Sequence, residues 1–388
     1  MVPVSYNLRS LTVRKATTIA TASGIALVVF VFSAVMMLGE GIKRTLALSG
    51  SRDIAIVLRK GSDAELSSSI ESSSVGLILA SKEVARRKDG SSDGVGEVVV
   101  VVTMNKAGTD GVSNLSIRGT SDGVYDFRPE VKLIEGRKAQ PGADECVIGR
   151  AIRGRFAGVD LGQSFELRKN RPLKVVGVFE SGGSSLESEV WADNDTVRSA
   201  FGREGIVQSV RARLVNEAAF DSFEHAIEGN RQLGLDVLRE SAFYEKQSEG
   251  TTQFITTLGT VVAFFFAIGA MIGAMITMYS AVAHRKREVG TLRALGFGKL
   301  AILTSFLFEA LVLALIGGAV GALASLAMGM VRFSMVNMAS WSEVVFSFEP
   351  SASTVGTALI FAGVMGLLGG LAPAVRAARM PLVQALKD

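Results

Sequence analysis

The sequence predicts an α-helical membrane protein with four transmembrane helices and a large α+β extracytoplasmic domain between helices 1 and 2. Hydrophobic residues make up 48% of the 388 residues and charged residues only 20%, which is too apolar for an ordinary soluble chain. About 210 polar residues separate the first two apolar stretches, and this length is enough for a domain with its own core. Four apolar stretches contain a single charged side chain, Glu309: residues 16–39, 251–283, 300–331 and 351–375.

Each apolar stretch is long enough to cross a bilayer, because about 20 helical residues span its hydrocarbon core. A helix also satisfies the backbone polar groups, which find no water partner there. Residues 16–39 exceed the roughly 7–15 apolar residues of a secretory signal. No small-residue cleavage site precedes Glu40. We therefore expect the first stretch to be an uncleaved anchor.

The distribution of Lys and Arg predicts the orientation. Short cytoplasmic segments carry an excess of these residues. Residues 1–16, residues 284–299 and the tail after Pro373 are all basic, whereas the loop 332–350 holds two acids and one base. We expect both termini and the 284–299 loop in the cytoplasm, and the loop 332–350 outside with the large domain.

Two of the spans are expected to continue as helical stalks. No proline interrupts the sequence from Ser241 to Ala283, or from Ala16 to Leu46, so a helix can run through each. The expected organisation, with cytoplasmic, membrane and external segments alternating, is 1–15 (cytoplasmic), 16–44 (helix 1 and stalk), 45–245 (external domain), 246–283 (stalk and helix 2), 284–299 (cytoplasmic loop), 300–331 (helix 3), 332–350 (external loop), 351–375 (helix 4) and 376–388 (cytoplasmic tail).

The external domain has the pattern of a mixed α+β fold. β-Branched runs bounded by Gly, Asn or Pro predict strands, and periodic apolar residues among strong helix formers predict helices. The predicted strands are 53–59, 97–104, 113–119, 161–168, 171–180, 206–214 and 235–239, and the predicted helices are 75–88, 149–157, 193–201 and 216–229.

The sequence contains no recognisable catalytic, cofactor or metal motif. The patterns H-E-x-x-H and G-x-x-x-x-G-K-[ST] are absent from the 388 residues. One cysteine and two histidines make a disulfide framework or a Cys/His metal site unexpected. The basic residues lack the interleaved aromatics of a nucleic-acid surface. If the protein uses ATP, we expect a different polypeptide to bind it.

Two sequence motifs resemble a known family. Residues 284–296 (HRKREVGTLRALG) are similar to the R-x-x-E-[IV]-G-x-L-R-A-L-G signature of permease subunits in the MacB/FtsX-like family of ABC transporters. Residues 373–387 are similar to the closing P-A-x-x-A-A-R-x-x-P-x-x-A-L-[RK] pattern of that family, through Pro373, Arg379 and Pro381, although one residue rather than two separates Arg379 from Pro381. Shorter matches at 7–9, 133–137, 145–149 and 175–179 extend the resemblance over nearly the whole chain.

The resemblance implies a role for the basic loop 284–299 as the coupling helix that fits a groove on an ATPase subunit. An amphipathic helix ending at Gly296 would present charged side chains to that partner while Val289, Leu292 and Leu295 pack inward. The alternative is a positive-inside anchor that faces only headgroups and water. The residues expected to couple are Arg285, Arg287, Glu288, Gly290, Arg293 and Gly296.

The resemblance further implies a MacB-like periplasmic core domain, with an inserted β-rich subdomain at about 113–196, in a bacterial inner-membrane permease. Such a protein works by mechanotransmission, with ATP and Mg²⁺ bound by a separate ATPase subunit. The implied partners are a second copy or a homologous permease, membrane lipid and, where the host has two membranes, a periplasmic adaptor and an outer-membrane channel. The cargo would be a lipid, lipoprotein, peptide or small amphiphile.

Two other functions remain open from the sequence. One is the FtsX-like alternative, a transmembrane regulator that activates a cell-wall hydrolase without transport. The other is a membrane-anchored enzyme, which the absence of a triad or metal set disfavours.

Two features of the spans also leave alternatives. A carboxylate near the bilayer centre is costly, so Glu309 is either a polar contact that changes between transport states or a partner of a loop arginine. The pairs Gly269/Gly273 and Gly317/Gly321 allow helices to approach closely, either within one chain or at a dimer seam.

Overall fold

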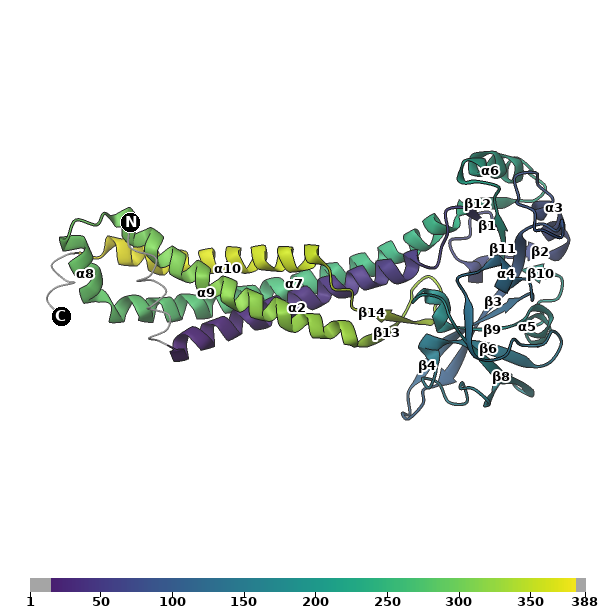
Figure 1. The fold of residues 1–388 in the computed structure, drawn as a ribbon, viewed down its shortest axis with the longest axis horizontal. Helices are drawn as coiled ribbons and strands as arrows, with labels where there is room; N and C mark the ends of the chain where they lie inside the picture. Colours follow the sequence, from purple (N-terminus) through teal and green to yellow (C-terminus); the bar gives the residue numbers. More distant parts are fainter. Residues whose placement is uncertain (1–14, 382–388) are drawn as a thin grey trace. The chain divides into compact units, whose positions relative to one another are not determined.

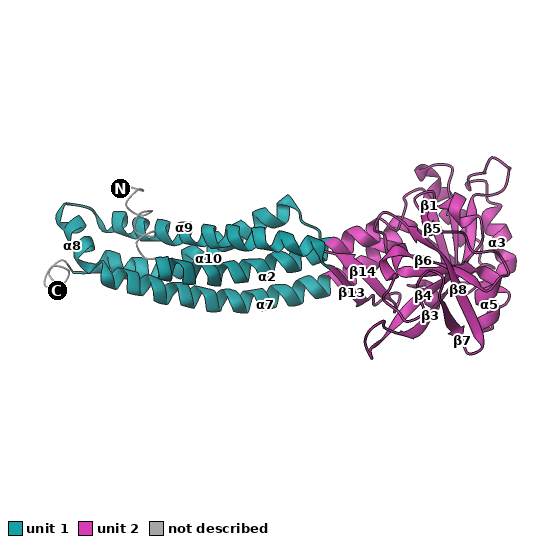
Figure 2. Ribbon diagram, turned by 60° about the horizontal axis from the view of Figure 1, so that its bottom comes forward, with its two compact units in different colours: residues 1–40, 253–331, 348–388 teal, residues 41–252, 332–347 magenta. Residues whose placement is uncertain are grey.

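The computed structural model describes residues 15–381, which form two compact units (Figure 2). The helical unit contains residues up to 40, residues 253–331 and residues from 348 onward. The sheet unit contains residues 41–252 and 332–347. The chain therefore passes between the units four times. The predictions for residues 1–14 and 382–388, including the 7–9 motif and the end of the 373–387 motif, lie outside the described residues.

Four described helices are long and apolar enough to cross a membrane (Figure 1). The two longest, α2 with 33 residues and α7 with 45, are unbroken, as the absence of proline predicts. A short helix, α8 (Lys286–Ala294), lies between α7 and α9. The bounds of the long helices are α2 (Lys15–Ala47), α7 (Glu240–His284), α9 (Lys299–Ser325, continued by the 3-10 segment η5, Leu326–Met330) and α10 (Ala352–Arg379).

Small residues set the packing of the helical unit. A Cβ added to Gly366 of α10 would overlap the Cβ of Ala314 on α9. A Cβ on Gly317 or Gly321 of α9 would overlap the backbone of α2. Small residues permit such close approach of transmembrane helices. The Gly317/Gly321 pair therefore packs helices within one chain, which was one of the two alternatives for it.

The sheet unit is built on one large mixed sheet. Its strands follow the order β12-β1-β11-β3-β4-β9-β6-β8-β5, and β7 pairs with β8. The pairs β4/β9 and β6/β8 are parallel, and the other pairs of this sheet are antiparallel. The bounds are β1 (Ile54–Arg59), β3 (Gly94–Asn105), β4 (Val112–Thr120), β5 (Lys132–Gly136), β6 (Glu145–Gly149), β7 (Ser164–Arg168), β8 (Arg171–Glu180), β9 (Glu189–Asp193), β11 (Ser209–Arg213) and β12 (Leu235–Arg239).

The long strand β3 joins the two halves of this sheet. Its first part, 94–97, pairs with β11, and its second part, 98–105, pairs with β4. Val98 and Val100 are buried in a single apolar core that also takes residues from β1, β6, β8 and β12. Residues 113–196 thus continue the sheet that β1, β11 and β3 begin. The remaining helices of the unit are α3 (Ser72–Leu79), α4 (Val124–Phe127), α5 (Asn194–Phe201) and α6 (Phe220–Glu228).

The segment between α9 and α10, predicted as an external loop, forms a hairpin. Strands β13 (Arg332–Val336) and β14 (Glu343–Ser347) pair in antiparallel register. The buried carboxylate of Glu343 lies 2.9 Å from Lys106 Nζ. The backbone N–H of Val345 donates to Ser188 Oγ at 3.0 Å. The hairpin is therefore part of the sheet unit.

The predicted fold class is confirmed, but several smaller elements differ. The helix expected at 149–157 is wrong, because Gly154 and Gly158 adopt positive φ angles of 68° and 78° and leave only a 3-10 turn, η2 (Arg150–Ile152). The helix expected at 75–88 ends at Leu79. The predicted strand at 206–214 is interrupted, so that 206–207 (β10) pairs instead with β2 (Ile70–Glu71). Strands β5, β6 and β9 were not predicted.

We expect Gly366→Leu to destabilise the helical unit by about 2 kcal/mol, because the added side chain overpacks the α9–α10 contact. Gly356→Leu on the same helix is the matched control, since a Cβ there has no neighbour within 4 Å. Thermal unfolding of both variants in detergent checks this. Equal midpoints for the two variants would contradict the packing described.

Candidate functional site

The predicted coupling segment folds as helix α8 and ends as its sequence indicates. Gly296 has a φ of 96°, which favours glycine. Its N–H donates to the Arg293 carbonyl at 3.1 Å, and the N–H of Phe297 donates to the Leu292 carbonyl at 3.1 Å. These two bonds satisfy carbonyls that the helix end would leave open.

The packing of α8 agrees in part with the expected amphipathic pattern. Val289 and Gly290 are buried, and Val289 lies in an apolar cluster with residues of α7, α9 and α10. Leu295 was expected to pack inward but is 72% exposed, so that expectation is wrong. Leu295 follows the last helical residue, Ala294, and the turn at Gly296 sets its direction. The exposed face of α8 therefore combines Arg287 with an apolar side chain, Leu295.

Arg285 is a buried residue that joins three helices. It is 5% exposed, and its Nη1 donates to Glu309 Oε2 of α9 at 2.9 Å. Its Nε donates to Glu288 Oε2 of α8 at 2.9 Å, and its guanidinium lies 5.6 Å from the centre of the Phe306 ring. Glu309 is thus paired with a loop arginine, as one of its two alternatives expected. Arg285 and Glu288 make contacts within the chain as well as belonging to the predicted coupling set.

The two family motifs meet in the structure. Arg293 Nη1 donates to the carbonyl of Met380, directly after α10, at 2.5 Å. Pro373 is buried inside α10, whereas Arg379 and Pro381 are exposed at its end. Segments 87 residues apart in the sequence are therefore in contact at the end of α8.

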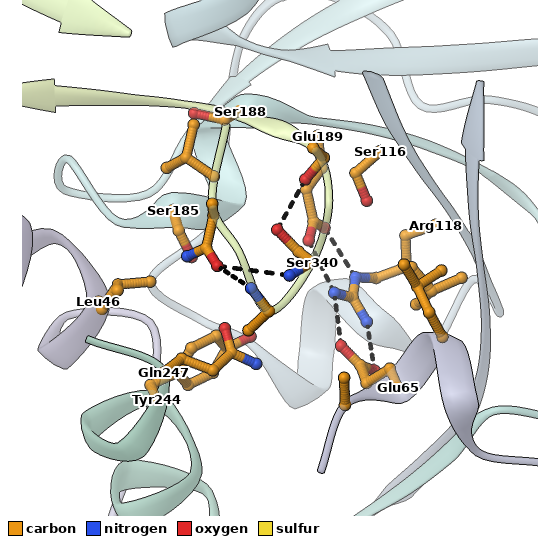
Figure 3. A pocket seen from close by; sticks show the side chains of 17 residues that line it. Leu46, Glu65, Ser116, Arg118, Ser185, Ser188, Glu189, Tyr244, Gln247 and Ser340 are labelled. Carbon is orange, nitrogen blue, oxygen red and sulfur yellow. Dashed lines mark hydrogen bonds and ion pairs between the residues drawn. The ribbon is translucent and has the colours of Figure 1, made fainter. Parts of the chain in front are cut away.

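A second site, in the sheet unit, was not found from the sequence. Figure 3 shows Arg118 between the carboxylates of Glu65 and Glu189. The guanidinium of Arg118 also donates to Glu97 at 2.9 Å. Arg211 donates to Glu65 at 2.9 Å as well. All members of this cluster, which we call the charge cluster, are at most 9% exposed: Glu65, Glu97, Arg118, Arg128, Glu189, Arg211 and Glu240.

Electrostatics favour the charged forms of Glu65 and Arg118 in the charge cluster. Burial raises the pKa of Glu65, but attraction to Arg118 and Arg211 outweighs burial and holds that pKa well below its usual value. Burial likewise lowers the pKa of Arg118, and Glu189, Glu65 and Glu97 together raise it well above the usual value. Buried charges persist only when they are paired in this way.

The sequence carries a weak signal for the charge cluster. Arg118 follows Ile117 in β4, Arg211 lies between Val210 and Ala212 in β11, and Glu97 directly precedes five valines. A charged residue at an inward position of a strand is unusual unless it has a partner. The partners come from strands and helices far apart in the sequence, so the pattern alone does not identify them.

A polar cavity of about 40 Å³ adjoins the charge cluster. Glu65, Arg118 and Glu189 line one part of its wall. Tyr244 and Gln247 of α7 line another, and Ser340 and its neighbours in the β13–β14 turn line a third (Figure 3). This volume accommodates water molecules rather than a drug-sized ligand.

Together these features define a class: a multi-pass membrane protein with an α/β domain inserted after its first helix and a short basic helix between its second and third. Two family models match the chain, the MacB-like periplasmic core domain over residues 18–230 and the FtsX-like permease C-terminal region over residues 260–382. The first match covers more than half of the chain. The chain therefore belongs to the MacB/FtsX-like family of ABC transporter permeases, which are multi-pass inner-membrane proteins.

Curated relatives carry the same family name. The macrolide export ATP-binding/permease protein MacB 1 of Aeromonas hydrophila subsp. hydrophila is 29% identical over 297 residues, which is 70% of this chain and 43% of that protein. The protein MacB of Escherichia coli strain K12 is 31% identical over 227 residues, 56% of this chain and 34% of that protein. The chain thus spans less than half the length of these relatives.

Two solved structures resemble the chain more distantly. The periplasmic region of MacB from Actinobacillus actinomycetemcomitans has a TM-score of 0.37 at 13% identity and covers 54% of this chain and 98% of that one. The extracellular domain of the ABC-type transporter YknZ from Gram-positive bacteria has a TM-score of 0.35 at 15% identity, over 48% of this chain and 99% of that one.

We expect Glu309→Gln to destabilise the helical unit by about 3 kcal/mol, because it leaves the buried Arg285 guanidinium without its main counter-charge. The double variant Arg285→Met/Glu309→Met removes both charges and should cost less than the sum of the two single changes. Unfolding midpoints in detergent check both statements. An additive double variant would show that the two side chains do not act as a pair.

We expect acid to weaken the sheet unit through Glu65. The pKa of this residue in the folded protein lies below its ordinary value of 4.5, so its contribution to stability is present above about pH 4.5 and is lost as the pH falls through the folded value. Thermal unfolding of the chain in detergent between about pH 3 and pH 7 measures this decline. Glu65→Gln should flatten the decline, and Glu166→Gln at an exposed strand position should leave it unchanged. Identical acid profiles for wild type and Glu65→Gln would contradict the assignment.

Proposed function

We propose that the chain is the permease component of an ABC transporter that works by mechanotransmission. An ATPase that these 388 residues do not contain binds ATP and Mg²⁺ and displaces α8. The spanning helices carry this displacement to the sheet unit, which handles the cargo on the outer side. The proposal rests above all on the connectivity of the chain.

The connectivity gives every spanning helix a covalent link into the sheet unit. The four passages between the units lie at residues 40/41, 252/253, 331/332 and 347/348. Helices α2 and α7 cross their passages without a break, and α9 and α10 lead into the two strands of the β13–β14 hairpin. A relative displacement of the helices would therefore act on the sheet unit at three elements: the end of α2, the start of α7 and the β13–β14 hairpin.

Helix α8 is fixed to its neighbouring helices, so a displacement of α8 would move them with it. Arg285 ties the start of α8 to Glu309 of α9, and Arg293 ties its end to the Met380 carbonyl after α10. Val289 packs α8 onto the apolar cluster beneath it. The exposed face, with Arg287 and Leu295, is the surface that we assign to contact with the ATPase.

Export of an amphiphilic cargo fits the curated relatives, whose names describe macrolide export. Membrane lipid contacts the spans, and a periplasmic adaptor with an outer-membrane channel would complete an export path. The alternative, an FtsX-like regulator of a cell-wall hydrolase, would use the same membrane part. The proteins that co-purify with the chain from native membranes separate the two: an adaptor indicates export and a hydrolase indicates regulation.

A second copy or a homologous permease is a further proposed partner. Gly24 of α2 and Gly269 and Gly273 of α7 line an apolar groove, and a Cβ at each of them has no neighbour within 4 Å. This contrasts with Gly317 and Gly321, which pack within the chain. The open glycines leave room for a helix from another subunit to approach.

We expect the double variant Arg287→Glu/Leu295→Ser to lower the ATP hydrolysis activity that co-purifies with the tagged chain by about tenfold, because central charged and apolar contacts dominate protein interfaces. The yield of inserted chain should not change, since both side chains are exposed. Lys169→Glu, an exposed charge reversal in the sheet unit, is the control. Full activity with the double variant would exclude this face of α8 as the ATPase contact.

A further inference from the structure

The first residue of α7, Glu240, lies at the meeting point of several elements of the sheet unit. Its Oε1 accepts hydrogen bonds from Arg128 Nη2 and from Arg211 Nε, the latter at 2.8 Å. Its Oε2 accepts a bond from the backbone N–H of Ser51 at 3.1 Å. The carboxylate is 0% exposed, so α7 begins with a buried charge that three donors satisfy.

The same point holds the end of α2. Ser51 lies four residues after the last residue of α2, Ala47, and the N–H of Ser241 donates to its carbonyl at 3.2 Å. A Cβ on Gly50 would lie 2.7 Å from the Glu240 carbonyl oxygen, so the two backbones touch there. Glu240 therefore connects the ends of both stalk helices to the sheet strand β11, which carries Arg211.

One turn further along, α7 is packed differently. Tyr244 is 4% exposed, and its hydroxyl has no hydrogen-bond partner among the described residues. It lines the polar cavity, together with Gln247 of α7, Leu46 of α2 and Ser340 of the β13–β14 turn (Figure 3). A cavity of about 40 Å³ holds a few water molecules. Helix α7 is thus tightly bound to the sheet at Glu240 and separated by a polar cavity from the hairpin turn.

We propose that Glu240 is a positioning residue that locks the outer ends of α2 and α7 to the sheet. An ion pair suits this task because its geometry is directional, and its loss leaves the buried Arg128 guanidinium with only the exposed Glu130 at 3.4 Å and removes one of the three carboxylates around Arg211. Apolar contacts would allow the helix end to slide. The role of Glu240 in transmission rests on the proposed function, whereas the anchoring itself does not.

Hydrogen–deuterium exchange of the full chain in phospholipid nanodiscs tests the anchoring. The amides of residues 244–248 are the first in α7 that bond within the helix, so they report the opening of its first turns. We expect Glu240→Gln to speed their exchange by roughly tenfold or more. We expect Glu240→Asp, which keeps the charge and shortens the reach, to act in the same direction without unfolding the domain.

Glu189→Gln is the matched control, because Glu189 is another buried acid of the charge cluster and contacts Arg118 and Trp191 rather than α7. It should speed exchange in β4 and β9 and leave residues 244–248 at the wild-type rate. The proposal is overturned if Glu240→Asp leaves residues 244–248 at that rate. It is also overturned if Glu189→Gln opens them as much as Glu240→Asp does.

The proposed function and the anchoring by Glu240 can be disproved independently of each other. If no ATPase co-purifies with the chain, the proposed function is wrong and the exchange result still stands. If an ATPase co-purifies and residues 244–248 do not respond to Glu240→Asp, the anchoring is wrong and the proposed function still stands.

Discussion

The sheet unit depends on the burial of four carboxylates with three guanidinium groups. Separate elements supply them: β3 provides Glu97, β4 Arg118, β9 Glu189 and β11 Arg211, and the start of α7 provides Glu240. Buried charges are tolerated only as a mutually paired set. The ion pairs therefore fix the positions of these strands relative to one another. They also fix the start of α7 to both halves of the sheet.

In the helical unit, the same constraint applies where α8 meets α9. Its helices approach one another closely at glycine and alanine and also pack larger side chains such as Val29 and Met365. The pair of Arg285 and Glu309 adds direction where α8 meets α7 and α9. Helix α7 is consequently tied by ion pairs at each end, through its first residue, Glu240, and through Arg285, which follows its last residue, His284.

Features that depend on a single stretch of the chain could be predicted from the sequence. About 20 apolar residues must form a spanning helix, and valine-rich runs such as 97–102 must lie in a sheet. Positive φ angles at Gly154 and Gly158 are set by tertiary context, so the helix expected at 149–157 failed. The charge cluster and the 332–347 hairpin depend on partners remote in the sequence, and the exposed position of Leu295 depends on a single turn at a helix end.

A helix held at both ends can pass on a displacement only if it does not bend in between. Helix α7 contains no proline, and its 45 residues correspond to about 67 Å at the ideal rise per residue. Its weakest points are its glycines, which cost about 0.5–1 kcal/mol each relative to alanine. Gly259 is packed tightly against Val35 of α2, whereas Gly269 and Gly273 have open surroundings. Any bending of α7 is therefore expected at Gly250, Gly269 and Gly273, which all have open surroundings. A neighbouring subunit packed at Gly269 and Gly273 would stiffen the helix that carries the displacement.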